Sequence, residues 1–270
     1  MIKISVILPV CGVAAYIEKC IQSLLNQTLS DMEFIFVDDH SPDNSIEIAK
    51  QVIKSHTREK QFVFLRPEHN LGPGMARNFA IPQATGEYIA FCDADDWVES
   101  TMYEQLYTQA QTYQAQISSA AAILDYPDGS HQQMTNPYIG CGEISTKQRK
   151  YLLSHFVSNF TTMLFRREWL NQYSIRFPDA RSGEDSSFMG QCYLLVQRIA
   201  QTNQPLYHYV IHGDSISHRK HIWRGKDKRK AFGYLLNFAK RNQLWSIYRN
   251  QLILLYIKKA LLTPIKEWIH

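Results

Sequence analysis

The sequence predicts an α/β protein with a mostly parallel sheet that is covered by helices. In the first half of the chain, short apolar runs typical of buried strands alternate with segments whose apolar residues recur at helical spacing. This alternation indicates parallel strands joined by helical crossovers. The expected strands are residues 4–8, 33–37, 62–65 and 88–91, and the expected helices are 15–27, 45–55, 72–80 and 100–113.

Each of these elements has a local signal. The first strand is a continuous apolar run, and the helix after it repeats apolar residues at positions 17, 20, 21, 24 and 25. The second strand stops at Asp38-Asp39, and residues 41–44 supply capping side chains and a proline for the next helix. The third helix opens on Gly72-Pro73-Gly74, and we expect Ser100 to cap the fourth.

The pattern is less regular beyond residue 117. We expect a strand at 117–126, a turn at 127–129 and a helix capped by Ser145 that ends near residue 154. Strands at 160–165 and 206–211 flank a helix that follows Gly183-Glu184-Asp185. A polar loop at 212–228 then leads to two C-terminal helices, at 229–241 and 244–262.

Length and charge suggest one domain with an appendage. The chain has 270 residues, of which 45% are hydrophobic and 20% charged, and this composition excludes low-complexity disorder, collagen and a coiled coil. Residues 219–270 carry a net charge of +11, whereas the remainder carries −7. We therefore expect a boundary near residue 220, cation binding in the acidic body and contact with anions or a membrane surface in the basic tail.

Several classes of protein are excluded or disfavoured. The longest apolar run near the C-terminus, residues 252–257, is far shorter than the roughly 20 residues that span a bilayer. The apolar start of the chain lacks the basic leader and cleavage site of a signal peptide. Five cysteines with no C-x-x-C pair indicate reduced thiols, and we expect a cytoplasmic protein.

Acidic clusters follow two of the expected strands. Asp38-Asp39 ends the second strand and Asp93-Ala94-Asp95-Asp96 follows the fourth. Ligands of open α/β sheets bind at such carboxyl ends, and paired carboxylates suit Mg²⁺ or Mn²⁺. The alternatives are a solvated acidic turn at the second cluster and helix capping at the first. We expect Asp39 rather than Asp38 to contact a ligand.

These features together resemble family 2 glycosyltransferases of the GT-A fold. The resemblance covers the first 100 residues densely and continues more sparsely to about residue 220. It implies a Rossmann-like mixed sheet with helices on both faces, a C-terminal helical tail, and a metal-dependent inverting transfer from a nucleotide-sugar. Its motifs are Pro9, Gln27-Thr28, Val37-Asp38-Asp39-x-Ser41, Asn70-x-Gly72, Ala76-Arg77-Asn78, Gly86-Glu87-Tyr88-Ile89 and Asp93-x-Asp95-Asp96.

The resemblance also implies roles for individual residues. Residues 1–100 would form the nucleotide-binding half and 101–220 the acceptor half, with 221–270 as a basic helical extension. Pro9 would open the nucleotide pocket, and Asp39, next to Asp38, would contact the base. The segment Asp93-Ala94-Asp95 would face ribose and metal, with Asp95 most directly on the Mn²⁺ or Mg²⁺ ion. The chain departs from the family at Cys11-Gly12-Val13, a segment that the resemblance implies would line the donor pocket.

Arg77 and Gly183-Glu184-Asp185 complete the expected site. Arg77 would either bind the diphosphate or brace the acidic loops through a carboxylate. Family members place a Glu-Asp pair in the acceptor half, so we expect Asp185 to be the general base and Glu184 to help to position the acceptor. The alternative for this pair is a capping role at the N-terminus of its helix.

The last part of the chain leaves more alternatives open. Residues 215–220 resemble a variable family loop, in which His218 would be a third metal ligand and Arg219 or Lys220 would hold the diphosphate. The final helix either packs on the body or contacts anionic lipid. No nucleic-acid-binding motif is recognisable. The apolar face of that helix is formed by Leu252, Leu255, Tyr256 and Leu262, with Lys259 beside it.

The sequence thus predicts an inverting glycosyltransferase. It would move a hexose or N-acetylhexosamine from a UDP-sugar to a glycan or lipid-linked glycan hydroxyl in surface polysaccharide or lipopolysaccharide synthesis. It would act in the cytoplasm, at the inner face of the plasma membrane if the tail binds lipid. The alternatives are a nucleotidyltransferase on a similar sheet and a catalytically silent protein that binds sugar nucleotides or glycans.

Overall fold

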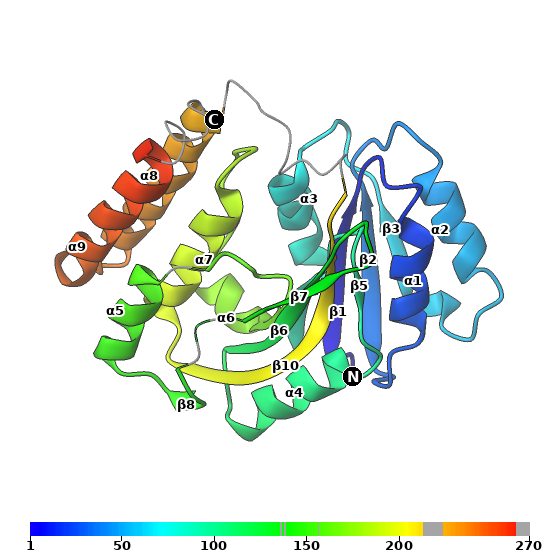
Figure 1. Ribbon diagram of the computed structural model, residues 1–270, viewed down its shortest axis with the longest axis horizontal. Coiled ribbons are helices and arrows are strands. Elements are labelled where there is room, and N and C mark those ends of the chain that lie inside the picture. The colour runs from blue at the N-terminus through cyan, green and yellow to red at the C-terminus, as the bar shows by residue number, and fades with distance from the viewer. Residues whose placement is uncertain (136, 138, 156, 213–223, 263–270) are drawn as a thin grey trace.

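The computed structural model describes residues 1–135, 137, 139–155, 157–212 and 224–262. These residues form one ten-stranded mixed sheet whose main path is β3-β2-β1-β4-β9-β6-β10-β5 (Figure 1). Strands β7 and β8 pair with β6 and β10 off this path. The strands are β1 (Ile4–Val10), β2 (Met32–Asp38), β3 (Phe62–Leu65), β4 (Tyr88–Phe91), β5 (Trp97–Val98), β6 (Ile117–Asp125), β7 (His131–Met134), β8 (Gly142–Glu143), β9 (Met163–Arg166) and β10 (Arg198–Val210).

The direction of the strands explains why the sheet is mixed. Strands β1 to β4 are parallel to one another, as are β6 and β10. Between these two groups lies β9, which is antiparallel to both β4 and β6. The parallel sheet predicted from the first half of the chain is therefore confirmed there, and the mixed sheet implied by the family resemblance is confirmed for the whole.

Helices cover both faces of the sheet, as expected. Along β1, Ile4, Val6 and Leu8 join one buried cluster with α1, α2 and α4, whereas Ile7 joins a second cluster with α3, α6 and α7. This alternation follows from the two-residue period of a strand. The helices are α1 (Ile17–Leu25), α2 (Ser45–Ile53), α3 (Pro73–Ala80), α4 (Met102–Thr112), α5 (Thr146–Ser154), α6 (Arg167–Gln172), α7 (Glu184–Leu195), α8 (Arg224–Arg241) and α9 (Trp245–Tyr256), followed by a π-helical turn (Ile257–Leu262).

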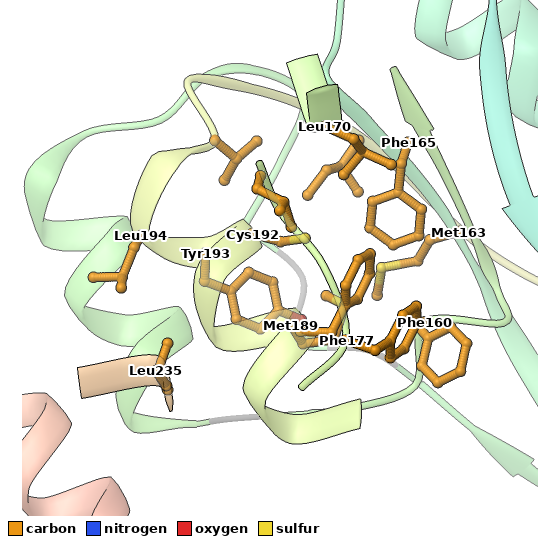
Figure 2. Close-up of a cluster of buried hydrophobic side chains, with 14 of the residues drawn as sticks. Phe160, Met163, Phe165, Leu170, Phe177, Met189, Cys192, Tyr193, Leu194 and Leu235 are labelled. Carbon is orange, nitrogen blue, oxygen red and sulfur yellow. The ribbon is translucent and has the colours of Figure 1, made fainter. Parts of the chain in front are cut away.

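The second cluster holds α7 and β9 together (Figure 2). The rings of Phe177 and Phe188 are stacked with centroids 4.2 Å apart, and Phe165 packs against Phe188. Leu235 reaches the cluster from α8 and fills the space over Gly190. Aromatic packing of this kind contributes stability beyond simple area burial, so the start of α7 is held firmly against the sheet.

Several expected boundaries are wrong. Helix α4 begins at Met102 after Thr101 and takes no cap from Ser100. Strand β10 starts eight residues earlier than expected, because polar residues at 201–204 interrupt its apolar pattern around a register shift. Helix α8 begins at Arg224, since its first turns are too polar to show a helical period. The expected capping of α5 by Ser145 is confirmed, with Gln148 completing a capping box.

The C-terminal helices pack on the body. Leu252 and Leu255 of α9 are 1% and 4% exposed and belong to the same buried cluster as α7. The packing alternative therefore holds for these two residues of the apolar face that the sequence assigned to this helix. Within the described ranges, no helix is both long and apolar enough to cross a bilayer. The domain boundary near residue 220 falls outside the described residues and stays a prediction.

Candidate functional site

The two acidic clusters meet at the carboxyl edge of the sheet, which is the upper edge in Figure 1. Strand β1 lies between β2 and β4, with Val10 paired to Asp38 and Ile7 paired to Phe91. Asp39 and the segment that begins at Asp93 therefore emerge on either side of the end of β1. This arrangement places Pro9 and Cys11 between the clusters, as expected for a ligand site at the strand ends.

The four-residue acidic segment has one inward carboxylate and two accessible ones. Asp96 is 2% exposed and accepts hydrogen bonds from the Tyr207 hydroxyl (2.5 Å) and the Val210 amide (2.8 Å), so its role is structural. The side chains of Asp93 and Asp95 are 30% and 26% exposed. Burial and the nearby charge of Asp93 raise the pKa of Asp95.

Arg77 of α3 connects this segment to α7. Its side chain is 5% exposed, and its Nη2 donates to Asp93 Oδ1 at 2.5 Å, while its Nη1 lies 3.9 Å from Asp185 Oδ1. The guanidinium also lies over the rings of Phe160 and Phe177, at 4.7 and 5.4 Å. Of the two roles that the sequence left open, the structure supports the bracing of the acidic groups.

Asp185 is both accessible and electrostatically strained. It lies in the first turn of α7, where the helix dipole favours a carboxylate. Its side chain is 43% exposed, yet its Oδ1 is buried and has no hydrogen bond partner. Burial of this oxygen and the charge of the adjacent Glu184 raise the pKa of Asp185 well above the usual value, against the opposing effect of Arg77.

Glu184 lies deeper than its neighbour. It is 7% exposed, and its Cγ lies only 3.1 Å from where a Cβ on Gly74 would be. This close approach explains the glycine at the start of α3. Burial raises the pKa of Glu184. The expected role of Glu184 in positioning the acceptor stays a prediction, because its carboxylate is buried between α3 and α7.

The expected base-binding pair is engaged with the protein. The Asp39 carboxylate accepts hydrogen bonds from the amides of Leu71 (2.6 Å) and Gly72 (2.8 Å). Asp38 accepts from the Ser41 amide and from Arg66 Nη1. Both pairs of contacts fix the loops around the strand ends, so any contact of these carboxylates with a nucleotide is additional to a structural role.

Two residues at the site were missed by sequence reasoning. His212 Nε2 lies 2.9 Å from Asp95 Oδ2, the ring stacks on Tyr16 with centroids 4.3 Å apart, and Nδ1 is buried without a partner. Arg181 donates from Nη2 to Asn70 Oδ1 at 3.1 Å. The position of His212 just after β10 could have indicated the first. No local signal indicated Arg181, because a tertiary contact brings it there.

His218 and Arg219, which were expected to bind the metal and the diphosphate, lie outside the described residues. In the part of the chain that the structure describes, no group of three or more His, Cys, Asp or Glu side chains is close enough to hold a metal ion. The protein thus offers two partly exposed carboxylates and one histidine at this edge. Further ligands would have to come from a bound substrate or water, as is common for Mg²⁺.

Comparison with known proteins identifies the family. A family-wide sequence model described as glycosyl transferase family 2 matches residues 5–174. The chain belongs to glycosyl transferase family 2. The match includes both acidic clusters and Arg77, and it ends before α7. Membership in this family removes the nucleotidyltransferase alternative.

Individual relatives agree with this membership. The uncharacterized glycosyltransferase EpsJ of Bacillus subtilis is 33% identical over 223 residues, which cover 79% of this chain and 62% of EpsJ. S. aureus TarS 1-349, solved with UDP-GlcNAc, matches with a TM-score of 0.73 and 22% identity, over 99% of this chain and 79% of that chain. The mannosyltransferase PcManGT of Pyrobaculum calidifontis, solved with GDP-Man and Mn²⁺, matches with a TM-score of 0.67 and 16% identity, over 98% and 73% of the two chains. The structural matches support the GT-A fold.

Proposed function

We propose that this family 2 glycosyltransferase performs an inverting transfer from a UDP-sugar to a glycan hydroxyl. One observation carries the proposal: the buried guanidinium of Arg77 joins Asp93 of the acidic segment to Asp185 of α7. The acidic segment proposed to face the donor's diphosphate and the candidate base therefore lie on either side of one arginine. The UDP moiety is supported by the fold shared with TarS, which was solved with UDP-GlcNAc.

The residues present fit a divalent cation. Asp93 and Asp95 are hard oxygen ligands that repel each other, and the buried, unpartnered Nδ1 of His212 marks an imidazole whose interactions are incomplete. Because no three such side chains among the described residues are close enough to hold an ion, we propose that Asp95 and His212 bind Mn²⁺ or Mg²⁺ together with donor oxygens and water. Asp95 Oδ2 and His212 Nε2 lie 2.9 Å apart, and the charge of Asp93 is nearby. When bound, the ion would offset negative charge on the leaving diphosphate. His212 takes the place in this proposal that the sequence assigned to His218.

Asp185 would act as the general base. Inversion requires the acceptor hydroxyl to attack the anomeric carbon from the side opposite the diphosphate while losing its proton. A carboxylate on a helix that faces the acidic segment suits that task, and its raised pKa makes it a better proton acceptor. Arg77 lies between the two groups and would fix the distance between them.

The donor pocket would extend along the strand ends from Pro9 to Arg181. Arg181 lies over Gly72, and its charge acts on the thiol of Cys11, whose pKa is raised by burial and by nearby aspartates including Asp39. Because Arg77 is occupied by carboxylates, we propose that Arg181 supplies the accessible cation on this side of the pocket. Replacement of Arg181 by Ala should weaken UDP binding without changing the proton transfer step.

The acceptor would be a glycan or a lipid-linked glycan, as in surface polysaccharide or lipopolysaccharide synthesis. This part of the proposal rests on membership in the family, and this chain spans 62% of the length of EpsJ. We further propose that the enzyme acts in the cytoplasm, with its basic C-terminal helices at the inner face of the membrane. The competing function is a silent sugar-nucleotide-binding protein on the same scaffold.

The decisive experiment replaces Asp185 by Asn and measures transfer and UDP binding in parallel. Loss of the base should lower the transfer rate by about 10²–10⁴-fold. UDP affinity should stay within a few-fold of wild type, since the proposed donor site does not use Asp185. Retained transfer would place the base elsewhere. A wild-type protein that binds UDP yet transfers no sugar to any glycan tested would support the silent alternative.

The metal assignment is tested by calorimetry of UDP binding with and without Mn²⁺. We expect binding to require the ion in the wild type and to weaken at least tenfold in the Asp95→Asn and His212→Ala variants. The His218→Ala variant is the matched control and should behave like wild type. Metal-independent binding, or a larger effect at His218 than at His212, would contradict the assignment.

A further inference from the structure

Exposed apolar side chains are concentrated on the outer side of α9. The described residues expose ten large hydrophobic side chains, and five of these lie within one fifteen-residue segment at the C-terminus. The other five are scattered over separate elements of the body, where single exposed apolar residues are ordinary. We call the group on α9 and the turn after it the outer ridge. It consists of Ile247 (51% exposed), Ile253 (44%), Leu254 (46%), Ile257 (38%) and Leu261 (39%).

The outer ridge is a distinct face of its helix. Ile247 and Leu254 of α9 are seven residues apart and therefore lie along one line of the helix surface. Leu252 and Leu255, together with Tyr248, lie on the opposite side and are at most 5% exposed. The helix thus has two apolar faces. The sequence pattern revealed the inner one, which packs on the body, and the structure shows that the outer one has no partner among the described residues.

Exposed basic side chains are frequent on the two helices that carry the ridge and its neighbour, and one of them, Lys230, pairs with Asp179 of the body. Helices α8 and α9 form the outermost layer at one end of the molecule, and α5 and α7 lie between them and the sheet (Figure 1). The single acidic residue in the described part of this layer is Asp227, which is only partly exposed. The exposed basic residues are Lys226, Arg229, Lys230, Lys240, Arg241, Arg249 and Lys258.

An apolar stripe bordered by cations is the pattern of a helix that lies in the interface of an anionic bilayer. A second copy of the chain fits less well, because a symmetric contact over the ridge would bring two sets of basic side chains together. We propose that the outer ridge and its surrounding cations dock this chain on a membrane surface that contains anionic lipid. This assigns a surface to the membrane contact included in the proposed function and rests on that part of it alone.

The test is co-sedimentation of the full chain with vesicles of phosphatidylcholine, with and without phosphatidylglycerol. Wild-type protein should partition to the anionic vesicles, and high salt should weaken this binding. The Leu254→Glu variant should bind at least tenfold more weakly, and the variant Arg249→Gln, which removes an exposed cation one helical turn from Ile253, about fivefold more weakly. The Val63→Glu variant is the matched control, because Val63 is 39% exposed on β3, and it should bind like wild type.

Unchanged vesicle binding of Leu254→Glu would overturn the proposal, as would equal binding to neutral vesicles. The proposal would also be overturned, in favour of self-association, if the wild type did not bind vesicles but formed a dimer in sedimentation velocity. Leu254→Glu should then dissociate that dimer. UDP binding by the same variants separates this result from the enzymatic proposal. Variants that lose vesicle binding but keep wild-type UDP affinity support the role of the ridge and leave the donor site untouched. A wild-type protein that binds vesicles but shows no UDP binding would contradict the proposed donor site and not the ridge.

Discussion

Replacement of Arg77 by Met tests whether the buried guanidinium holds the site together. The side chain is 5% exposed, and it pairs with Asp93 while lying over two aromatic rings. Breaking a fully buried ion pair costs roughly 3–5 kcal/mol, and Asp93, at 30% exposed, would recover part of its hydration. The lost contact with the rings adds roughly 0.5–2 kcal/mol. We therefore expect a loss of about 3 kcal/mol in the free energy of unfolding.

The chain offers a matched control for this measurement. Arg66 Nη1 lies 2.7 Å from Asp38 Oδ2, a separation close to that of the Arg77 pair, but the Arg66 side chain is 62% exposed. An exposed pair contributes about 1 kcal/mol or less, so Arg66→Met should change stability little. Met replaces both arginines with an unbranched apolar side chain of comparable length, so the two variants differ chiefly in the burial of the arginine that they remove.

Thermal unfolding followed by circular dichroism measures the difference. At roughly 2–4 °C per kcal/mol, Arg77→Met should lower Tm by roughly 6–12 °C, and Arg66→Met by at most about 4 °C. Adding Asp93→Asn to Arg77→Met should be less destabilising than the sum of the two single changes, because the unpaired carboxylate is removed. Equal shifts in Tm for Arg77→Met and Arg66→Met would refute the reasoning that burial makes this pair strong.

Three further predictions concern single positions. Because the pKa of Asp185 is raised, activity should rise with pH, and the midpoint of the acid limb of the kcat/KM profile should lie above the pKa of an ordinary aspartate. An acid limb near pH 4 would contradict the raised pKa of the base. The same raised pKa means that ionisation of Asp185 favours the unfolded chain, so Asp185→Asn should raise Tm at pH 7. The variant should lose this advantage as pH falls below the pKa of an unfolded aspartate, where the carboxyl is protonated in both the folded and the unfolded state. Gly86→Ala should lower the free energy of unfolding in urea by several kcal/mol, because a Cβ there would lie 2.6 Å from the Ser5 amide nitrogen. Gly129→Ala should lower it less despite its positive φ, since a Cβ there would meet nothing within 4 Å. Similar losses for the two variants would argue against a backbone clash at Gly86.

Sequence alone determined the first half of the fold, from β1 to α4. The alternation of apolar runs and helical periods located β1 to β4 and α1 to α4 to within a few residues, because each element there follows a regular local pattern. The acidic clusters were placed correctly at strand ends for the same reason. The short strands β5, β7 and β8 and helix α6 were missed. Strands β5 and β8 have only two residues, β7 is mostly polar and α6 is shorter than two turns, so none of them shows the apolar run that marked the four-residue strands β3 and β4.

Only the tertiary structure decided which side chains meet at the site. Asp185 lies 108 positions after Arg77 in the chain, and their proximity arises because α3 and α7 pack on the same face of the sheet. Tertiary packing also brings His212 beside Asp95, and it separates the buried face of α9 from the exposed one. A local sequence pattern indicates whether a segment forms a helix or a strand and which of its faces is apolar. Contacts between residues of distant elements depend on how those elements pack in three dimensions, and the periodicity of a single segment carries no information about that packing.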